Sequence, residues 1–249
     1  NYLNILYKYN DTDFIPKNYN NLSFADKNLN LWIITKAIEF KKNIKFSKNF
    51  KLKKLRNNLY IKRKSYKQKI LDVFNLKKKN KKFLFNNIGL SFRDTLKLYV
   101  KLRAYPIFWT DVNYTSLDYD MKKRSKIFNH SFKDRNFLSF FKSILRFSIP
   151  QSYLEDFNQI KKKLEKKYKR KKIKHIFTAT EYKKNDEFKI WTAEQKIYGA
   201  QYNCIQHGGT FGVIDFNREV DMIHSVSDKF LTSGWRDKNK KTVPFSSFF

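Results

Sequence analysis

Several residue types are scarce in this sequence, and each scarcity excludes a class of protein. One Cys among 249 residues excludes a disulfide-stapled secreted domain and fits a reducing compartment, so we expect a cytoplasmic protein. No run of about 18 apolar residues occurs, so no membrane-spanning helix is predicted. Hydrophobic residues nevertheless make up 41% and aromatic residues 18%, which excludes a disordered basic tail. The sequence therefore predicts a globular chain with one sizeable core or two modest domains.

Acidic residues are also scarce, since 22 Asp and Glu face 54 Lys and Arg and give a net charge of +32. Such a charge suggests a polyanionic partner, either nucleic acid or an acidic membrane. However, 44 of the basic residues are Lys and only 10 are Arg, whereas nucleic-acid recognition favours the planar guanidinium of Arg. The abundant Lys, Asn, Ile, Phe and Tyr all have A/T-rich codons, so the base composition of the gene explains much of the charge. We expect no nucleic-acid partner, and a basic nucleic-acid-binding module stays open as an alternative.

Residues 1–149 are predicted to form a mixed, mostly helical N-terminal region. One helix is expected over residues 91–102, with Pro106 beyond its end. A second is expected over residues 137–149, where polar side chains recur at helical spacing in an otherwise apolar sequence. These polar residues are Ser139, Lys142, Ser143 and Arg146. The helix either faces the core or lies on an anionic membrane. If it lies on a membrane, the protein could be a non-catalytic scaffold at the membrane surface, and this alternative stays open. The membrane anchors would be Phe137, Phe140, Phe141 and Phe147.

Residues 150–249 are predicted to form a Rossmann-like α/β region. An apolar stripe indicates a first helix, with a run of lysines largely on its solvated face. The stripe is Tyr153, Phe157, Ile160, Leu164 and Tyr168, and the lysines are Lys161–Lys163 and Lys166–Lys167. We then expect a strand over residues 173–180 and a helix over residues 186–198 that ends near Gly199. Two further strands are expected over residues 201–206 and 229–232. A strand–helix–strand order implies a parallel sheet that binds ligands at the carboxyl ends of its strands.

Glycine is scarce but concentrated, because five of the six glycines lie in residues 199–249. The segment Gln206–Gly212 reads Gln-His-Gly-Gly-Thr-Phe-Gly and directly follows a predicted strand. Glycines let backbone N–H groups converge on an anion, and His207 can accept a proton or donate to a phosphate oxygen near neutral pH. Lipases use a similar run in an oxyanion hole, but the Gly-x-Ser-x-Gly element that they need is absent from this sequence. We therefore predict a ligand site around His207.

Acidic and histidine residues follow this segment. Glu219 and Asp221 are predicted to orient or activate His207, and His224 is predicted to bind a diphosphate. Packing or surface roles stay open for each of them. His207, His224 and Asp228 match no standard metal-ligand spacing, so no metal site is predicted. Cys204 precedes the loop within a strand, where a buried and inert thiol is expected.

Two stretches of the chain follow a sequence pattern known from other proteins. The first is Phe188-Lys189-Ile190-Trp191-x-Ala193-Glu194, followed by Gly199 and by Gln206-His207-Gly208-Gly209-x-Phe211-Gly212. The second is Ser227-Asp228-Lys229-Phe230-Leu231-Thr232-Ser233-Gly234-Trp235. Together they resemble a bacterial transferase family linked to the synthesis of O-antigen and other surface polysaccharides. The chain departs from the family pattern at three positions, with Phe211 in place of Tyr, Ser233 in place of Trp, and Ser225 in place of an acid. The resemblance covers about residues 150–245.

The resemblance implies a GT-B-like glycosyltransferase that moves a sugar from a nucleotide-sugar donor to a lipid-linked glycan acceptor, with no cofactor required. Together with the predicted helix over residues 137–149, a lipid-linked acceptor favours peripheral contact with an anionic membrane, so we expect the protein to lie against the inner membrane. The implied catalytic residues are His207 and Glu219, and the implied substrate-binding residues are Gln206, Gly208, Gly209, Gly212, His224 and Trp191. Members of the family are longer than this chain. We therefore expect a fragment that lacks a second GT-B domain beyond residue 249 and is inactive alone.

Overall fold

The computed structural model describes residues 82–127, 136–168, 173–214 and 217–245, together with residues 33, 34, 36, 37 and 40. The helical character expected for most of residues 1–81 lies outside the described residues. The chain divides into two compact units. The first comprises Asn1–Ile61 and Tyr114–Gln159, and the second comprises Lys62–Asn113 and Ile160–Phe249. The boundary predicted between residues 149 and 150 stays a prediction.

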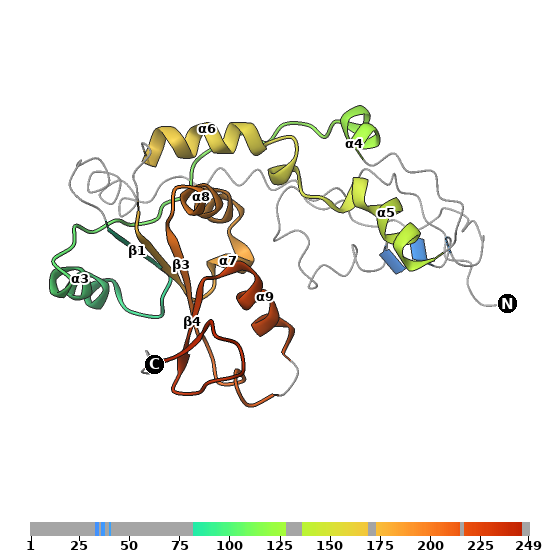
Figure 1. The fold of residues 1–249 in the computed structure, drawn as a ribbon. Helices are drawn as coiled ribbons and strands as arrows, with labels where there is room; N and C mark the ends of the chain where they lie inside the picture. The colour runs from blue at the N-terminus through green and yellow to red at the C-terminus, as the bar shows by residue number, and fades with distance from the viewer. Residues whose placement is uncertain are drawn as a thin grey trace. The chain divides into compact units, whose positions relative to one another are not determined.

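The described part of the chain contains both helices and strands (Figure 1). In chain order they are β1 (Phe83–Asn86), α3 (Phe92–Lys101), α4 (Met121–Ile127), α5 (Phe137–Ser148), the 3-10 turn η3 (Gln151–Tyr153), α6 (Phe157–Tyr168), β2 (His175–Thr178), α7 (Glu181–Lys184), α8 (Asp186–Ile197), β3 (Gln201–Ile205), α9 (Arg218–Val226), β4 (Lys229–Ser233) and β5 (Thr242–Phe245).

The strands form one parallel sheet in the order β1-β2-β3-β4-β5. This confirms the predicted fold class, a Rossmann-like parallel α/β sheet with helices. The strands expected over residues 173–180, 201–206 and 229–232 are β2, β3 and β4. The sequence analysis does not predict the edge strands β1 and β5. Each has only four residues, and β5 contains Pro244, a residue that strands accept mainly at a sheet edge.

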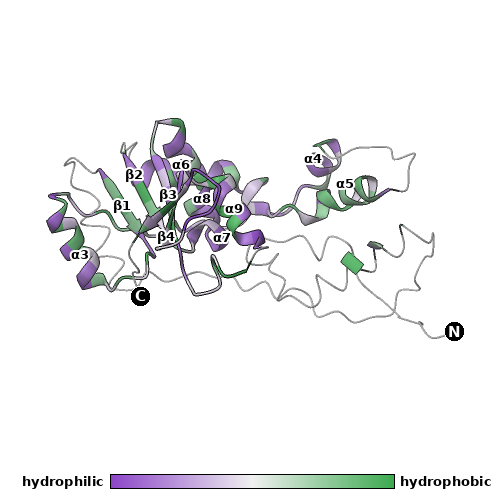
Figure 2. Cartoon of the chain, turned by 60° about the horizontal axis from the view of Figure 1, so that its bottom comes forward, coloured by the Kyte–Doolittle hydropathy of each residue, from purple (hydrophilic) through white to green (hydrophobic). Residues whose placement is uncertain are grey.

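One face of the sheet packs against α6, α8 and α9. The register places Leu84, Ile176 and Tyr202 on this face, and all three are buried. An aromatic cluster forms the core of this layer. Trp109 stacks on Tyr168 with ring centroids 5.0 Å apart and meets Trp191 at 5.4 Å. Figure 2 shows the hydrophobic colouring concentrated in the strands, as expected for a sheet buried between helices.

The opposite face of the sheet packs against α3. Phe85, Tyr99 and Phe108 are buried there with Ile205, and the Tyr99 hydroxyl donates to the backbone carbonyl of Ile107 over 2.6 Å. Helix α3 occupies the predicted span of residues 91–102, and its N-cap Ser91 accepts from the backbone N–H of Asp94. Sheet and helices together hold the carboxyl ends of the strands in fixed positions.

The lysine run on α6 is only partly solvated. Lys162 and Lys166 are exposed, as predicted. Lys163 instead donates to the backbone carbonyl of Asn113 over 2.7 Å, and Lys167 donates to the carbonyls of Thr110 and Asp111 over 2.8 and 2.7 Å. These lysines bind the preceding segment of the same unit, because its carbonyl groups lack strand partners that would satisfy them.

Within the first unit, a buried arginine joins α4 to the segment after α5. The guanidinium of Arg124 is fully buried and makes two 2.6 Å hydrogen bonds to the carboxylate of Glu155. It also donates to the carbonyls of Arg146 and Ile149 over 2.8 and 2.9 Å. Burial alone would raise the pKa of Glu155, but the hydrogen bonds from Arg124 hold that pKa below its usual value.

Helix α5 forms as predicted but exposes a different side. Ser139, on the predicted polar stripe, is buried, as is Phe147, one of the proposed membrane anchors. Phe137 and Phe141 are exposed, by 78% and 45%, together with Leu138 at 56%. The helix turns a largely apolar side outward over its first turns, and its N-cap Asn136 accepts a hydrogen bond from the backbone N–H of Ser139.

Candidate functional site

The candidate site lies where parallel strands β2 and β3 end. The segment that begins at Gln206 leaves β3 at its carboxyl end, and α7 begins directly beyond the end of β2. Because β2 and β3 are parallel neighbours, the residues after both strands reach the same edge of the sheet. The backbone at Gly208 and Gly212 has φ values of +93° and +78°, in the left-handed region that favours glycine. Residues 208–210 and 212–214 are exposed.

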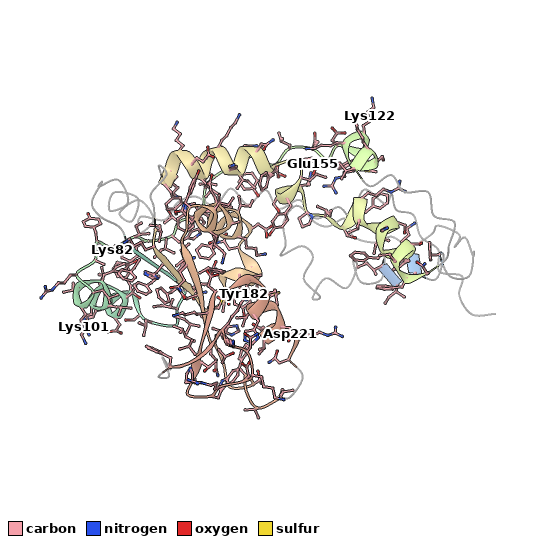
Figure 3. All side chains as sticks on the ribbon, in the orientation of Figure 1. Lys82, Lys101, Lys122, Glu155, Tyr182 and Asp221 are labelled. Carbon is pink, nitrogen blue, oxygen red and sulfur yellow. The ribbon has the colours of Figure 1, made fainter. Side chains whose placement is uncertain are left out.

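The carboxylate of Glu219 contacts three hydrogen-bond donors at this edge of the sheet. Its Oε1 atom lies 2.9 Å from Nε2 of His207 and also accepts hydrogen bonds from the Tyr182 hydroxyl and from Nζ of Lys183. The Tyr182 oxygen is in turn 3.2 Å from Nε2 of His207. Figure 3 labels Tyr182 on α7, and α9, which carries Glu219, also carries the labelled Asp221. Two helices and one loop thus converge on a single carboxylate.

The electrostatics of this cluster favour an ionised Glu219. Burial alone would raise the pKa of Glu219, but the hydrogen bonds from Lys183 and Tyr182 and the positive charge of Lys183 hold that pKa below its usual value. Burial raises the pKa of the Tyr182 hydroxyl, and its hydrogen bond to the Glu219 carboxylate raises it further. At neutral pH the cluster therefore holds a carboxylate, an ammonium group and a protonated phenol.

A second group of contacts fixes the glycine-rich loop. The amide oxygen of the buried Gln206 accepts from the indole N–H of Trp235 over 2.6 Å and from the backbone N–H of Ser233 over 2.9 Å. The amide nitrogen of Gln206 donates to the carbonyl of Gly208 over 3.0 Å. Gly212 lies flat on the Trp235 ring, so that a Cβ atom there would stand 2.6 Å from the ring. The loop after β3 is therefore clamped to the segment after β4.

Comparison with known proteins identifies the family of this chain. The family model of the LIC12162 family transferase matches residues 1–249. The chain belongs to the LIC12162 family of transferases. No curated protein and no solved structure matches it. The resemblance to a transferase family, and hence the expectation of an enzyme, is confirmed at that level.

Not all predicted site residues of this LIC12162 family member come together. His207, Glu219, Gln206, Gly208, Gly209 and Gly212 lie at the loop. His224 instead points toward β5, where its Nε2 atom lies 2.9 Å from the hydroxyl of Thr242 and 3.6 Å from the carboxylate of Asp237. Trp191 is 1% exposed within the aromatic core of the sheet. The substrate contacts predicted for these two residues stay predictions.

Two residues of this transferase for which no ligand role is predicted, Asp228 and Cys204, lie away from His207. Asp228 precedes β4 and pairs with Lys196 over 2.6 Å, at the end of the strand opposite to the loop. Cys204 is buried in β3, and burial raises the pKa of its thiol to about 12.

In the part of the chain that the structure describes, no three His, Cys, Asp or Glu side chains are arranged to hold a metal ion. No described helix is long and apolar enough to span a membrane.

Three residues of the site were missed by sequence reasoning. Tyr182 and Lys183 belong to α7, a single turn of helix that follows β2, and Trp235 follows β4. A usable signal was present for all three. Residues that follow neighbouring parallel strands meet at one edge of the sheet, so the segments after β2 and β4 were candidates once the segment after β3 had been chosen.

Proposed function

We propose that this transferase moves a sugar from a nucleotide-sugar donor to a glycan acceptor in bacterial surface polysaccharide synthesis of the O-antigen type. The observation that carries the proposal is a partly exposed imidazole at the carboxyl end of β3, held by a carboxylate and followed by an exposed glycine-rich turn. His207 is 25% exposed, so its ring is reachable from solvent. A base of this kind beside an exposed glycine-rich turn suits the attack of a hydroxyl on a phosphate-activated sugar.

The proposed reaction exchanges one bond at the anomeric carbon for another. An acceptor hydroxyl gives its proton to His207 while its oxygen forms a bond to the anomeric carbon. The bond from that carbon to the donor phosphate breaks, and the electron pair leaves with the nucleoside diphosphate. Backbone N–H groups around Gly208 and Gly209 are suited to receive the developing negative charge, because both residues are exposed and their Cα atoms carry no side chain.

The test is a transfer assay on the full-length protein with a panel of nucleotide sugars and lipid-linked acceptors. His207→Ala is expected to lower kcat by about 10²–10³-fold, because it removes the general base of the proposed reaction. Thr210→Ala is the matched control, since Thr210 is an exposed residue of the same segment. Wild-type transfer by His207→Ala, with the Thr210→Ala rate also unchanged, would overturn the assignment.

The proposal includes peripheral contact between α5 and an anionic membrane, where a lipid-linked acceptor would lie. Phe137, Leu138 and Phe141 are exposed at the start of this helix, and Lys142 and Arg146 lie further along it. Figure 2 shows hydrophobic colouring along α5, whereas α4 is mainly hydrophilic. Apolar side chains next to cations fit the boundary between acyl chains and anionic headgroups.

Vesicle flotation tests this contact. The wild-type protein is expected to float with vesicles that contain anionic lipid and to remain below neutral vesicles. The double variant Phe137→Ser/Phe141→Ser should lose flotation, whereas Phe157→Ser should keep it, because Phe157 is an exposed Phe on another helix. Equal flotation of the double variant and the Phe157→Ser control would refute the role of α5.

A further inference from the structure

The hydrogen bonds around His207 determine which of its two ring nitrogens carries the proton. Nε2 faces two oxygens, that of Glu219 at 2.9 Å and that of Tyr182 at 3.2 Å. An unprotonated Nε2 would hold its lone pair against the carboxylate of Glu219. A protonated Nε2 donates to that carboxylate and forms a charge-assisted hydrogen bond.

The Tyr182 hydroxyl agrees with this assignment. It has a single hydrogen, which it donates to Oε1 of Glu219. The Tyr182 oxygen can therefore only accept from Nε2 of His207. Burial and the Glu219 carboxylate both raise the pKa of Tyr182, so the phenol keeps its hydrogen throughout the neutral range. Both neighbours of Nε2 are then acceptors, and both require a proton on that nitrogen.

The other ring nitrogen is left open. Nδ1 of His207 has no hydrogen-bond partner among the residues that the structure describes, and the side chain is partly exposed. The ring also meets Phe211 edge to face, with centroids 5.2 Å apart. The Phe211 ring and the bonds at Nε2 together restrict rotation of the imidazole, so Nδ1 keeps one direction.

We infer that Glu219, supported by Tyr182 and Lys183, holds His207 as the tautomer with the proton on Nε2, so that Nδ1 is the atom that receives the proton of the acceptor hydroxyl. Tyr182 and Lys183 are positioning residues, since they act through Glu219. The tautomer rests on the geometry alone, whereas the role of Nδ1 as the reacting atom rests on the proposed function.

Lys183 has a distinct part in this arrangement. Its ammonium group pairs with the same carboxylate oxygen that His207 uses. Without Lys183, the Glu219 carboxylate loses one of the three donors that hold it beside Nε2 of His207. The described charged or titratable groups that face His207 are Glu219 from α9 and Tyr182 and Lys183 from α7. The neighbouring Lys184 is exposed and serves as the matched control.

The tautomer is tested by two-bond ¹⁵N–¹H NMR of the His207 ring, with the signal assigned from His207→Ala. The expected spectrum has an exchange-protected Nε2–H and an unprotonated Nδ1 in the wild-type protein and in Lys184→Met. In Glu219→Ala the protection of Nε2–H should disappear. A proton on Nδ1 in the neutral ring, or protection that survives Glu219→Ala, overturns the inference.

Kinetics test the positioning residues. In Lys183→Met, kcat should fall while KM changes little, relative to Lys184→Met, because the Glu219 carboxylate loses a donor that fixes it beside Nε2 of His207. Tyr182→Phe, which keeps the ring, should lower kcat with little change in KM. Equal kcat values for Lys183→Met and Lys184→Met overturn the role of Lys183. If no transfer activity is found while the NMR result holds, the proposed function fails and the tautomer stands.

Discussion

Replacing Gly212 with alanine tests how the loop after β3 is fixed. Gly212 has a φ of +78°, and an added Cβ would stand 2.6 Å from Cδ2 of Trp235. That distance is well below ordinary van der Waals contact, so either the indole or the loop must move. The indole N–H of Trp235 donates to Gln206 over 2.6 Å, so a shift of about 1 Å would stretch that bond beyond its useful range.

The magnitude follows from two contributions. A left-handed conformation costs an alanine about 1–2 kcal/mol. Loss of the hydrogen bond between Trp235 and Gln206 adds about 0.5–1.5 kcal/mol. We expect Gly212→Ala to lower the free energy of unfolding by about 1.5–3.5 kcal/mol, the sum of these two contributions.

Two other glycines of the same loop separate these contributions. Gly208 has a φ of +93°, but a Cβ there would meet no atom of the described residues within 4 Å. Gly208→Ala should therefore show the backbone cost alone, about 1–2 kcal/mol. Gly209 has neither a left-handed φ nor a crowded Cβ, so Gly209→Ala should be neutral or stabilising by a few tenths of a kcal/mol, about 0.5 kcal/mol at most.

Urea unfolding followed by circular dichroism measures the three free energies. Hydrogen exchange at the indole N–H of Trp235, assigned with Trp235→Phe, reports the local contact. Exchange should accelerate in Gly212→Ala and stay unchanged in Gly209→Ala. If Gly212→Ala and Gly208→Ala are equally destabilised and indole exchange is unchanged, the contact between Gly212 and Trp235 does not exist.

Three further outcomes follow from buried groups. Arg124→Met should destabilise the protein by about 3–5 kcal/mol in urea, because it leaves the buried Glu155 carboxylate unpaired; a loss below about 1 kcal/mol would contradict this. The folded-state pKa of Glu155 is lowered, so the stability that its carboxylate contributes is present at neutral pH and is lost as the pH falls below the usual carboxyl range. In urea melts at several pH values, the stability of Glu155→Gln should therefore fall less in acid than that of the wild-type protein. Because burial raises the pKa of the Cys204 thiol to about 12, Ellman's reagent at pH 8 should label the protein only as fast as it unfolds, and rapid labelling of the native protein would refute that burial.

The central strands and the loop of the site were predictable because their signals are local. β-Branched and aromatic residues mark β2, β3 and β4, and a glycine cluster directly after β3 marks the place where backbone approaches a ligand. The edge strands were missed because β1 directly follows a lysine-rich stretch that is typical of a connector, and because β5 contains Pro244, which argues against a strand. The outward side of α5 was missed because burial of Ser139 depends on what packs against the helix, not on its periodicity.

The partners of His207 illustrate the limit for sites. Glu219 was predicted from its position after the loop, and the structure places it 2.9 Å from His207. Tyr182 and Lys183 precede the loop by a whole helix and strand, and their meeting with Glu219 depends on the strand order. His224 lies on the same helix as Glu219, but helical geometry turns it toward Thr242. The spacing of residues along the chain therefore does not predict which side chains meet at the site, because that depends on the strand order of the sheet.

The sequential strand order has a consequence for how the sheet assembles. Each of β3, β4 and β5 pairs with the strand that precedes it in the chain, so each can add to an existing edge soon after it is synthesised. β1 is different, because α3, α4, α5 and α6 all separate it from its partner β2. The long connection makes loop closure between β1 and β2 the entropically most demanding pairing of the sheet. We expect β2 to β5 to form the folding nucleus and β1 to pair last. Pairing of β1, the edge strand farthest from Trp235, is then the slow step of sheet formation.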